Sequence, residues 1–526
     1  MSKWRDFLDS QITIDGIHKA GKAAAASDKT VSALFDRYGI YAHSVEMCVD
    51  TVFFIAKEAV LGSGKKHLVL AESPETVKTG RIPNPFSDFE GYTERISGFT
   101  VRCCELTHHN AAALRKHFPY SAPVCLRSRD ITIGLGDRLG IATPGHIRLV
   151  KNYDIAPVFA QQSIRELTLT GRTYENVLDD VTFAVFQEGY KTGFGADGDH
   201  LKTAEEVKMA LDLGYTMLTL DCSEHINNDI AGLNSGAVDT LYTALDPTVT
   251  ARYEHKYLGS RTVGGQTFDI TLASLKKIVL IYNPAIDFAE KIYKTFFEDG
   301  GNVVFELSID ETMTPTAPEA HYLVAAELFD RGVQIDNLAP RFCGEFQKGI
   351  DYIGDVGQFA SEFKTHCAIA EHFGYKVSVH SGSDKFSVFQ TVGDSSKGHY
   401  HLKTAGTNWL EAVRTVAKVN PGLYRRMHDY AVKHIDEARK YYHISAEAGN
   451  IPDIGHMKDT ELPTLMDQTD ARQFLHITYG LILTEGNRET FCNEFYNTLA
   501  EYEAEYADAL IAHLGKHLHT LNVPKR

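Results

Sequence analysis

The feature that most constrains the fold is a repeated alternation of short apolar runs and amphipathic helices between residues 126 and 409. Such alternation predicts parallel strands joined by helical crossovers, and eight such units close most naturally as a (β/α)8 barrel. The strand candidates are DITIGL (130–135), APVFAQ (156–161), KTGFGAD (191–197), TMLTLD (216–221), NVVFEL (302–307), DNLAPRF (336–342), KVSVHS (376–381) and YHLKTA (400–405).

The remainder of the chain divides around this barrel. We expect an N-terminal α+β region over residues 1–125, with a helix over residues 45–60, and a helical C-terminal region over residues 410–526. The barrel over residues 126–409 carries a long insertion at about 222–301, because that stretch exceeds a single crossover. An open doubly wound sheet is the alternative fold. It is disfavoured because the nearest glycine motif, GLGDRLG at residues 134–140, lacks the GxGxxG spacing.

The net charge and the cysteine content of the chain restrict the classes of partner and the cellular location that we expect. The formal net charge of −16 argues against nucleic acid or an anionic membrane as the main partner, and leaves a small-molecule substrate open. The eight cysteines form no CxxC pair, and the chain shows no signal peptide or membrane span, so free thiols and a cytoplasmic location are expected. A homo-oligomer is left open, since the C-terminal helices could either cap the barrel or bind a sister subunit.

Ionisable residues gather where the predicted strands end, which in a barrel is the active-site face. GFGADGDHLKT (193–203) contains Asp199 and His200, a possible base and metal ligand, although a helix cap and a surface histidine would also explain them. SVHSGSDKFS (378–387) offers His380 as a second ligand. The same segment offers hydroxyl- or anion-binding groups, against the alternative of a histidine bonded within a turn: Ser383, Asp384 and Lys385.

Other strand ends add further candidates. Alternation along a strand places Glu306 in the barrel lumen, where a carboxylate needs a cation, a proton or a structural salt bridge. Glu345 could complete a set of two histidines and one carboxylate with His200 and His380. Arg341 and Lys403 could bind an anionic substrate group. Rival ligands follow the fourth strand: Asp221, Glu224 and His225.

These motifs together resemble the tagaturonate/fructuronate epimerase family of hexuronate catabolism, some members of which are similar to ketohexose 4-epimerases. The resemblance runs through GFGADGDHLKT, TLDCSEHI, VVFELSIDET and SVHSGSDKFS in that order. It implies metal-dependent epimerisation of D-tagaturonate and D-fructuronate, with Asp199 as proton acceptor, Glu306 as proton donor, and His200 and His380 as metal ligands. Glu345 is the least secure of the ligands, and the cation could be zinc, manganese, iron, cobalt or nickel.

The expected reaction inverts a carbon two bonds from the ketone, where the C–H bond is not acidified by the carbonyl. Retro-aldol cleavage and re-addition is therefore the expected route, with the metal as Lewis acid. The competing interpretations are a metal-dependent sugar aldolase, an aldose–ketose isomerase, and a non-catalytic sugar-acid-binding protein.

Overall fold

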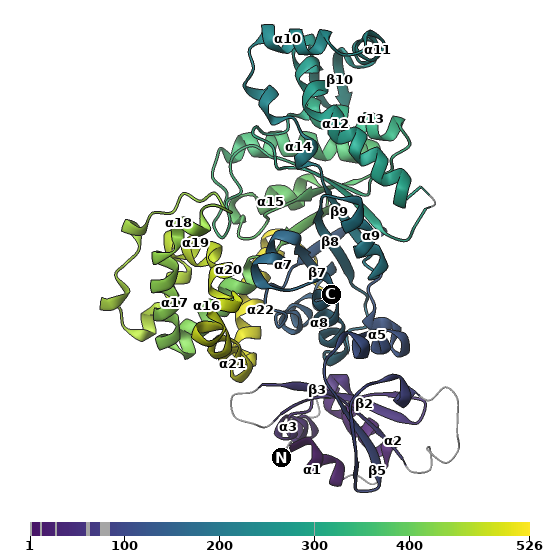
Figure 1. Cartoon of the computed structure of the whole chain (residues 1–526), viewed down its shortest axis with the longest axis vertical. Helices are drawn as coiled ribbons and strands as arrows, with labels where there is room; N and C mark the ends of the chain where they lie inside the picture. The colour runs from purple at the N-terminus through teal and green to yellow at the C-terminus, as the bar shows by residue number, and fades with distance from the viewer. Residues whose placement is uncertain (1–2, 11–12, 27–28, 59–63, 74–84, 299) are drawn as a thin grey trace.

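A computed structural model describes the chain except for residues 1–2, 11–12, 27–28, 59–63, 74–84 and 299. Its centre is a closed barrel of eight parallel strands in the order β12-β13-β14-β15-β6-β7-β8-β9, which confirms the predicted (β/α)8 fold (Figure 1). The barrel strands are β6 (Ile131–Leu135), β7 (Ala156–Ser163), β8 (Gly195–Leu201), β9 (Met217–Asp221), β12 (Val304–Ile309), β13 (Asn337–Pro340), β14 (Lys376–Val379) and β15 (Tyr400–Thr404).

Amphipathic helices cover the outside of the barrel. They include α6 (Thr143–Val150), α7 (Ile164–Thr170), α8 (Tyr174–Gln187), α9 (Ala204–Asp212), α13 (Pro318–Asp330), α14 (Val356–Phe373) and α15 (Phe386–Ser395). Local signals set their ends: Thr203 and Glu206 form a reciprocal capping box at the start of α9. Gly374 ends α14 in the left-handed conformation, which costs glycine no Cβ clash. Outward strand residues such as Phe305 and Leu307 pack into this helical layer.

The N-terminal region is a five-stranded antiparallel sheet with helices α1 (Lys3–Asp9), α2 (Ile14–Ala25), α3 (Lys29–Tyr38) and α5 (His108–His117). Its strands run in the order β1-β2-β3-β5-β4, namely β1 (Glu46–Cys48), β2 (Thr51–Lys57), β3 (Lys66–Glu72), β5 (Phe99–Cys104) and β4 (Tyr92–Ile96).

The helix expected over residues 45–60 is therefore wrong where the structure describes it; residues 59 and 60 lie outside the described part. Val52 and Phe54 of β2 pack on one face of the sheet, whereas Phe53 and Ile55 pack on the other. Burial on both faces removes the polar alternation by which a strand is usually recognised.

The insertion between β9 and β12 projects from one end of the molecule (Figure 1). It contains α10 (Ser235–Thr243), α11 (Pro247–Tyr257), the hairpin β10 (Gly259–Val263) and β11 (Gln266–Ile270), and α12 (Leu272–Phe296), which packs on the barrel.

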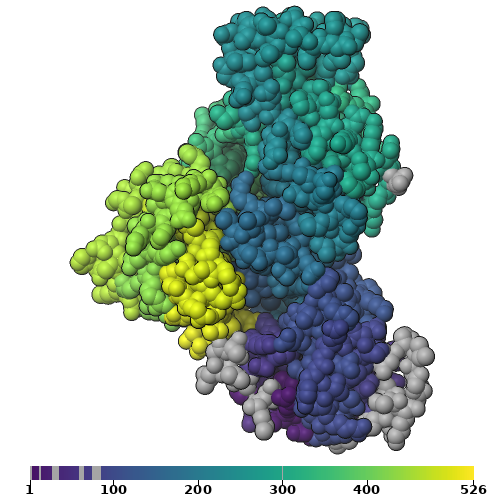
Figure 2. Space-filling model, in the orientation of Figure 1, coloured from purple at the N-terminus to yellow at the C-terminus, as the bar shows by residue number. Residues whose placement is uncertain are grey.

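The C-terminal region is helical as expected, with α16 (Thr407–Val419), α17 (Pro421–Lys433), α18 (Ile435–Ala438), α19 (Thr469–Ile477), α20 (Tyr479–Ile482), α21 (Asn493–Glu501) and α22 (Glu503–Thr520). It flanks the barrel, with α22 against α6 and α15 (Figures 1 and 2). All eight cysteines are free thiols. Within the described residues, none of the helices combines the length and hydrophobicity that crossing a membrane requires.

Candidate active site

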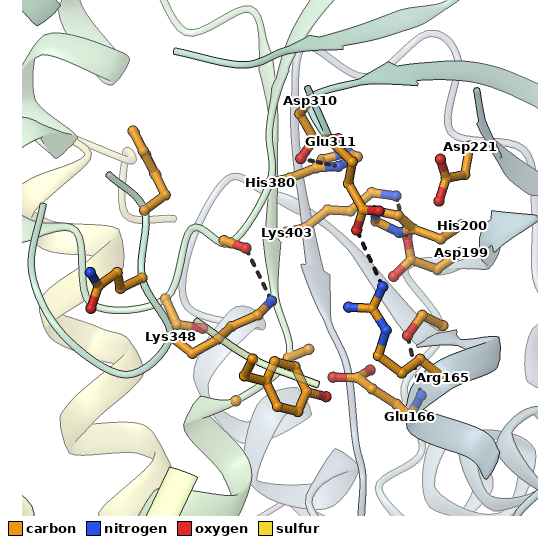
Figure 3. A pocket seen from close by; sticks show the side chains of 18 of the residues that line it. Arg165, Glu166, Asp199, His200, Asp221, Asp310, Glu311, Lys348, His380 and Lys403 are labelled. Atoms are coloured by element: carbon orange, nitrogen blue, oxygen red, sulfur yellow. Dashed lines mark hydrogen bonds and ion pairs between the residues drawn. The ribbon is translucent and has the colours of Figure 1, made fainter. Parts of the chain in front are cut away.

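A cavity of about 770 Å³ opens at the carboxyl ends of the barrel strands. Asp199 and His200 of β8, Asp310 just after β12, His380 just after β14 and Lys403 of β15 all line it (Figure 3). The side chains come from segments far apart in the chain, and parallel strands bring them to one end of the barrel.

A bulge in β8 places both Asp199 and His200 in the cavity. In a regular strand, neighbouring side chains point to opposite faces. Here the pairing of β8 with β9 shifts register between Gly198 and Leu201, and His200 has a φ of 57°, which is unusual for a residue with a side chain. The imidazole Nδ1 of His200 consequently lies 2.7 Å from Oδ1 of Asp199. The predicted strand over residues 191–197 starts too early, because β8 begins at Gly195 and contains this cluster.

His380 lies opposite His200, and a buried carboxylate likewise contacts one of its ring nitrogens. Its Nε2 lies 2.7 Å from Oε1 of Glu306, while its Nδ1 lies 3.4 Å from Oδ2 of Asp310. The rings of His380 and His200 have their centroids 5.0 Å apart. Each imidazole therefore has one nitrogen bound to a buried carboxylate and the other left for a ligand, the arrangement that protein metal sites use to orient histidines.

Potential metal ligands come together in His200, Asp310 and His380, whose donor atoms lie within 4.8 Å of one another. Glu345, the third ligand expected from the sequence, is outside this group. β13 ends at Pro340, and the chain then turns outward to a bridge between Glu345 and Ile353, which leaves the Glu345 side chain 47% exposed beside His443. The loop path therefore favours Asp310, which directly follows the last residue of β12, in place of Glu345.

Lys403 balances the carboxylates of the barrel lumen. Its Nζ lies 2.8 Å from Asp197, 2.7 Å from Asp199 and 2.9 Å from Glu306. Burial raises the pKa of Asp199 and of Glu306, but the Lys403 ammonium and the neighbouring histidines together outweigh it and hold both pKa values well below the usual range. Both carboxylates are thus ionised, and Lys403 is too fully paired to bind a substrate carboxylate.

Glu306 points into the lumen as expected. Besides His380 and Lys403, it accepts a hydrogen bond from Nδ2 of Asn337 at 3.1 Å and is fully buried. Its carboxylate lies behind His380 and is not part of the cavity lining. The proton-donor role expected for Glu306 and the proton-acceptor role expected for Asp199 stay predictions.

The remaining sequence candidates divide between the cavity and its surroundings. Arg341 and Ser383 line the cavity. Asp384 and Lys385 do not: Asp384 has a φ of 65° and its carboxylate binds Arg472 and His513 of the C-terminal helices. The Nζ of Lys385 donates to three backbone carbonyls. The substrate-binding role expected of these two residues is not supported, because the turn after β14 points them away from the cavity.

The rival ligands after β9 also lie outside the metal-ligand group. Asp221 lines the cavity, but its carboxylate caps the backbone N–H of Ser223. Glu224 pairs with Lys202, and His225 stacks on Phe288.

The cavity residues that sequence reasoning missed include Asp310, Lys348 and His476. The position of Asp310 immediately after a strand was a usable signal. Lys348 lies in a loop and His476 in the C-terminal region, so no local pattern marked either of them.

A closed parallel barrel that gathers carboxylates and imidazoles in one cavity at its strand ends is the arrangement of a (β/α)8-barrel enzyme. A sequence model of the tagaturonate epimerase family matches residues 41–521 of the chain. The chain belongs to the tagaturonate epimerase family and is therefore an isomerase-class enzyme.

Individual relatives agree with this membership. The chain is 39% identical over 486 residues to the tagaturonate/fructuronate epimerase of Thermotoga maritima, a match that covers 92% of this chain and 97% of that protein. It is 48% identical to the glycerol-complexed crystal structure of a fructuronate-tagaturonate epimerase from Cohnella laeviribosi, with a TM-score of 0.87 and coverage of 95% of this chain and 99% of that one. The native structure of the Cohnella enzyme matches with the same TM-score and identity, and covers 94% of this chain and 100% of that one.

Proposed function

We propose that this protein interconverts D-tagaturonate and D-fructuronate, using a divalent cation held by His200, Asp310 and His380. The observation that carries the proposal is the convergence of these three side chains at the cavity, each histidine bound from behind by a carboxylate. The named activity of relatives that match nearly the full chain supports the same conclusion.

The donor set fits a divalent metal. Two imidazoles and one carboxylate suit zinc, manganese, iron, cobalt or nickel, and they leave coordination positions open for substrate oxygens. Nδ1 of His380 is buried and makes no well-formed hydrogen bond within the described residues. The carboxylate of Asp310 lies 3.4 Å from it, so the two groups face each other as a pair of ligands would around a cation. When bound, the cation contributes Lewis-acid stabilisation of the negative charge that develops on the ketone oxygen.

The reaction begins at the hydroxyl of the carbon two bonds from the ketone. Asp199, ionised and facing the cavity, accepts the proton of this hydroxyl. The O–H electron pair becomes the carbonyl of an aldehyde, the adjacent C–C bond breaks, and its electron pair forms the enediolate of the other fragment. The aldehyde group then rotates so that its opposite face is presented, and the C–C bond re-forms on that face. The new alkoxide takes up one proton, which balances the proton that Asp199 removed. The family resemblance gives this step to Glu306, which has to gain a proton first because its carboxylate is ionised in the free protein.

Elemental analysis of the purified protein and an NMR assay on both ketouronates test the proposal together. We expect stoichiometric divalent metal, interconversion of the two acids, and loss of turnover on chelation that metal restores. Binding of tagaturonate without turnover or metal would instead support a sugar-acid-binding protein.

The route can be tested by running the reaction in deuterium oxide. Retro-aldol cleavage retains the original hydrogen on the inverted carbon, so we expect no deuterium at that position in the NMR spectrum of the product. Wash-in of deuterium there would reject cleavage in favour of direct proton exchange at carbon.

The role of Glu306 can be separated from metal binding with Glu306→Gln. The amide oxygen can still accept the His380 N–H, so we expect metal content to be kept, whereas the lost charge and proton should lower kcat by roughly 100-fold. Metal analysis beside steady-state kinetics checks this. Glu371→Gln, at an exposed carboxylate paired with Lys397, is the control. A fully active Glu306→Gln enzyme would remove Glu306 from the mechanism.

A further inference from the structure

The cavity differs in charge between its two ends. Around the candidate metal ligands it is acidic, with Asp199, Asp221, Asp310 and Glu311 in its wall. Lys348 lies apart from that group, across the cavity (Figure 3). A cavity with the candidate metal ligands on one side and a cation without an ion-pair partner on the other fits an elongated substrate with an anionic group at one end only.

Lys348 is a partly buried cation without an ion-pair partner in the described part of the chain, although the charge of Glu166 acts on it from the cavity wall. Its Nζ donates to the hydroxyl of Ser381 at 3.0 Å, and within the described residues no acidic side chain lies at ion-pair distance. Burial lowers the pKa of Lys348, which reflects the cost of holding this ammonium away from water. Two other cavity cations are already paired, Arg165 with Glu311 at 3.5 Å and Lys202 with Glu224 at 3.3 Å.

His476 is another polar group that lacks a partner. It belongs to α19 of the C-terminal region, lines the cavity and is 1% exposed, yet neither ring nitrogen has a hydrogen-bond partner among the described residues. Gly349 and Gly406 pack against its ring so closely that a Cβ at Gly406 would lie 2.0 Å from Cε1. Burial and then the charges of Arg138 and Lys348 hold the pKa of His476 well below its usual value, so it is neutral. A buried imidazole with no partner requires an explanation, and a bound acceptor supplies one.

On the basis of the proposed function, we propose that Lys348 and His476 bind the carboxylate of the ketouronate. Lys348 supplies the charge and His476 an N–H donor, so the site selects a sugar acid over the neutral ketose. Ser381, which Lys348 contacts, directly follows His380, so the carboxylate site adjoins the candidate metal ligands.

Holding the carboxylate also serves the cleavage. In a ketohexuronate the inverted carbon lies between the ketone side and the carboxylate side of the molecule. The aldehyde fragment therefore keeps the carboxylate. An ionic contact between this carboxylate and Lys348 retains the fragment in the cavity while its aldehyde group rotates. The C-terminal helical region thus completes the substrate site through His476.

The test compares Lys348→Met, which removes the charge, with Lys348→Arg, which keeps it. For Lys348→Met we expect kcat/KM on tagaturonate to fall by roughly 10- to 100-fold, the usual effect of losing one charge-assisted hydrogen bond. Affinity for tagatose, as substrate or competitive inhibitor, and metal content should stay unchanged. Lys348→Arg should recover part of the loss.

Arg341→Met is the matched variant. Arg341 also lines the cavity without an ion-pair partner in the described part of the chain, but its guanidinium donates to the backbone carbonyl of Thr312 beside the acidic end. Selective loss of uronate activity in Arg341→Met and not in Lys348→Met would overturn the proposal. A wild-type enzyme that turns over neither ketouronate would instead refute the proposed function.

A measurement on the wild-type protein does not depend on the variants folding. The methyl ester of tagaturonate keeps the shape of the substrate but not its charge, so we expect its kcat/KM to be lower by roughly 10- to 100-fold. Equal use of acid and ester would show that no cation recognises the carboxylate, and would refute the assignment of Lys348.

Discussion

Asp310→Ala should remove the divalent cation and abolish catalysis together. Asp310 is the carboxylate that lies with His200 and His380 in the potential ligand group, so its loss leaves two imidazoles that hold a cation weakly. We expect kcat/KM on tagaturonate to fall by at least about 100- to 1000-fold, as when a main electrostatic stabiliser is removed from an active site. Metal content after gel filtration and an NMR assay measure the two effects.

Glu345→Gln is the discriminating control for Asp310→Ala. Glu345 lines the same cavity, but its carboxylate accepts from Gln347 at 2.5 Å and lies away from the ligand group. We therefore expect Glu345→Gln to retain its metal. If Glu345→Gln loses the cation while Asp310→Ala keeps it, the ligand set suggested by the sequence is right and the one favoured by the geometry is wrong.

Lys403→Met should give the largest loss of stability of any single change in the barrel lumen. The buried Lys403 ammonium is the partner of Asp197, Asp199 and Glu306. Removing one member of a buried ionic network leaves uncompensated charge, which typically costs about 3–5 kcal/mol of unfolding free energy. Differential scanning calorimetry should show a lower unfolding temperature, or the variant should fail to accumulate as folded protein.

Two further variants test the cause of that loss. Lys397→Met removes an exposed pair with Glu371 and should change the unfolding free energy by less than about 1 kcal/mol. In the double variant Lys403→Met/Glu306→Gln one buried carboxylate is also neutralised, so part of the stability should return. A Lys403→Met protein as stable as the wild type would contradict the charge-balancing role of Lys403.

Much of the barrel could be predicted because its signals are local. Each of the eight predicted strands overlaps a barrel strand, and parallel pairing brings the ends of strands distant in sequence to one face. That rule alone was enough to group Asp199, His200 and His380 near one another. Alternation along β12 likewise placed Glu306 in the lumen, opposite in direction to Phe305 and Leu307.

In the loops that follow the strands, the sequence did not predict where the side chains point. The loop after β14 contains Ser381 and Asp384 at positive φ, and this backbone path turns Asp384 and Lys385 toward the C-terminal helices. Glu345 lies five positions beyond the end of β13, enough for the chain to leave the ligand group. Side-chain direction in such loops depends on backbone angles that residue type does not specify.

The sequence by itself determined the alternation of strands and helices, and with it the edge of the barrel at which the chemistry would gather. Only the tertiary structure decided that Asp310 lies with the two histidines and that His476 of α19 lines the cavity. It also decided that Lys403 forms ion pairs with three carboxylates. The physical reason is the sequence separation over which each signal acts. The periodic spacing of hydrophobic residues and the direction of a strand depend on residues that are near neighbours in the chain. Charge pairing and cavity shape, in contrast, arise from contacts between segments up to hundreds of residues apart.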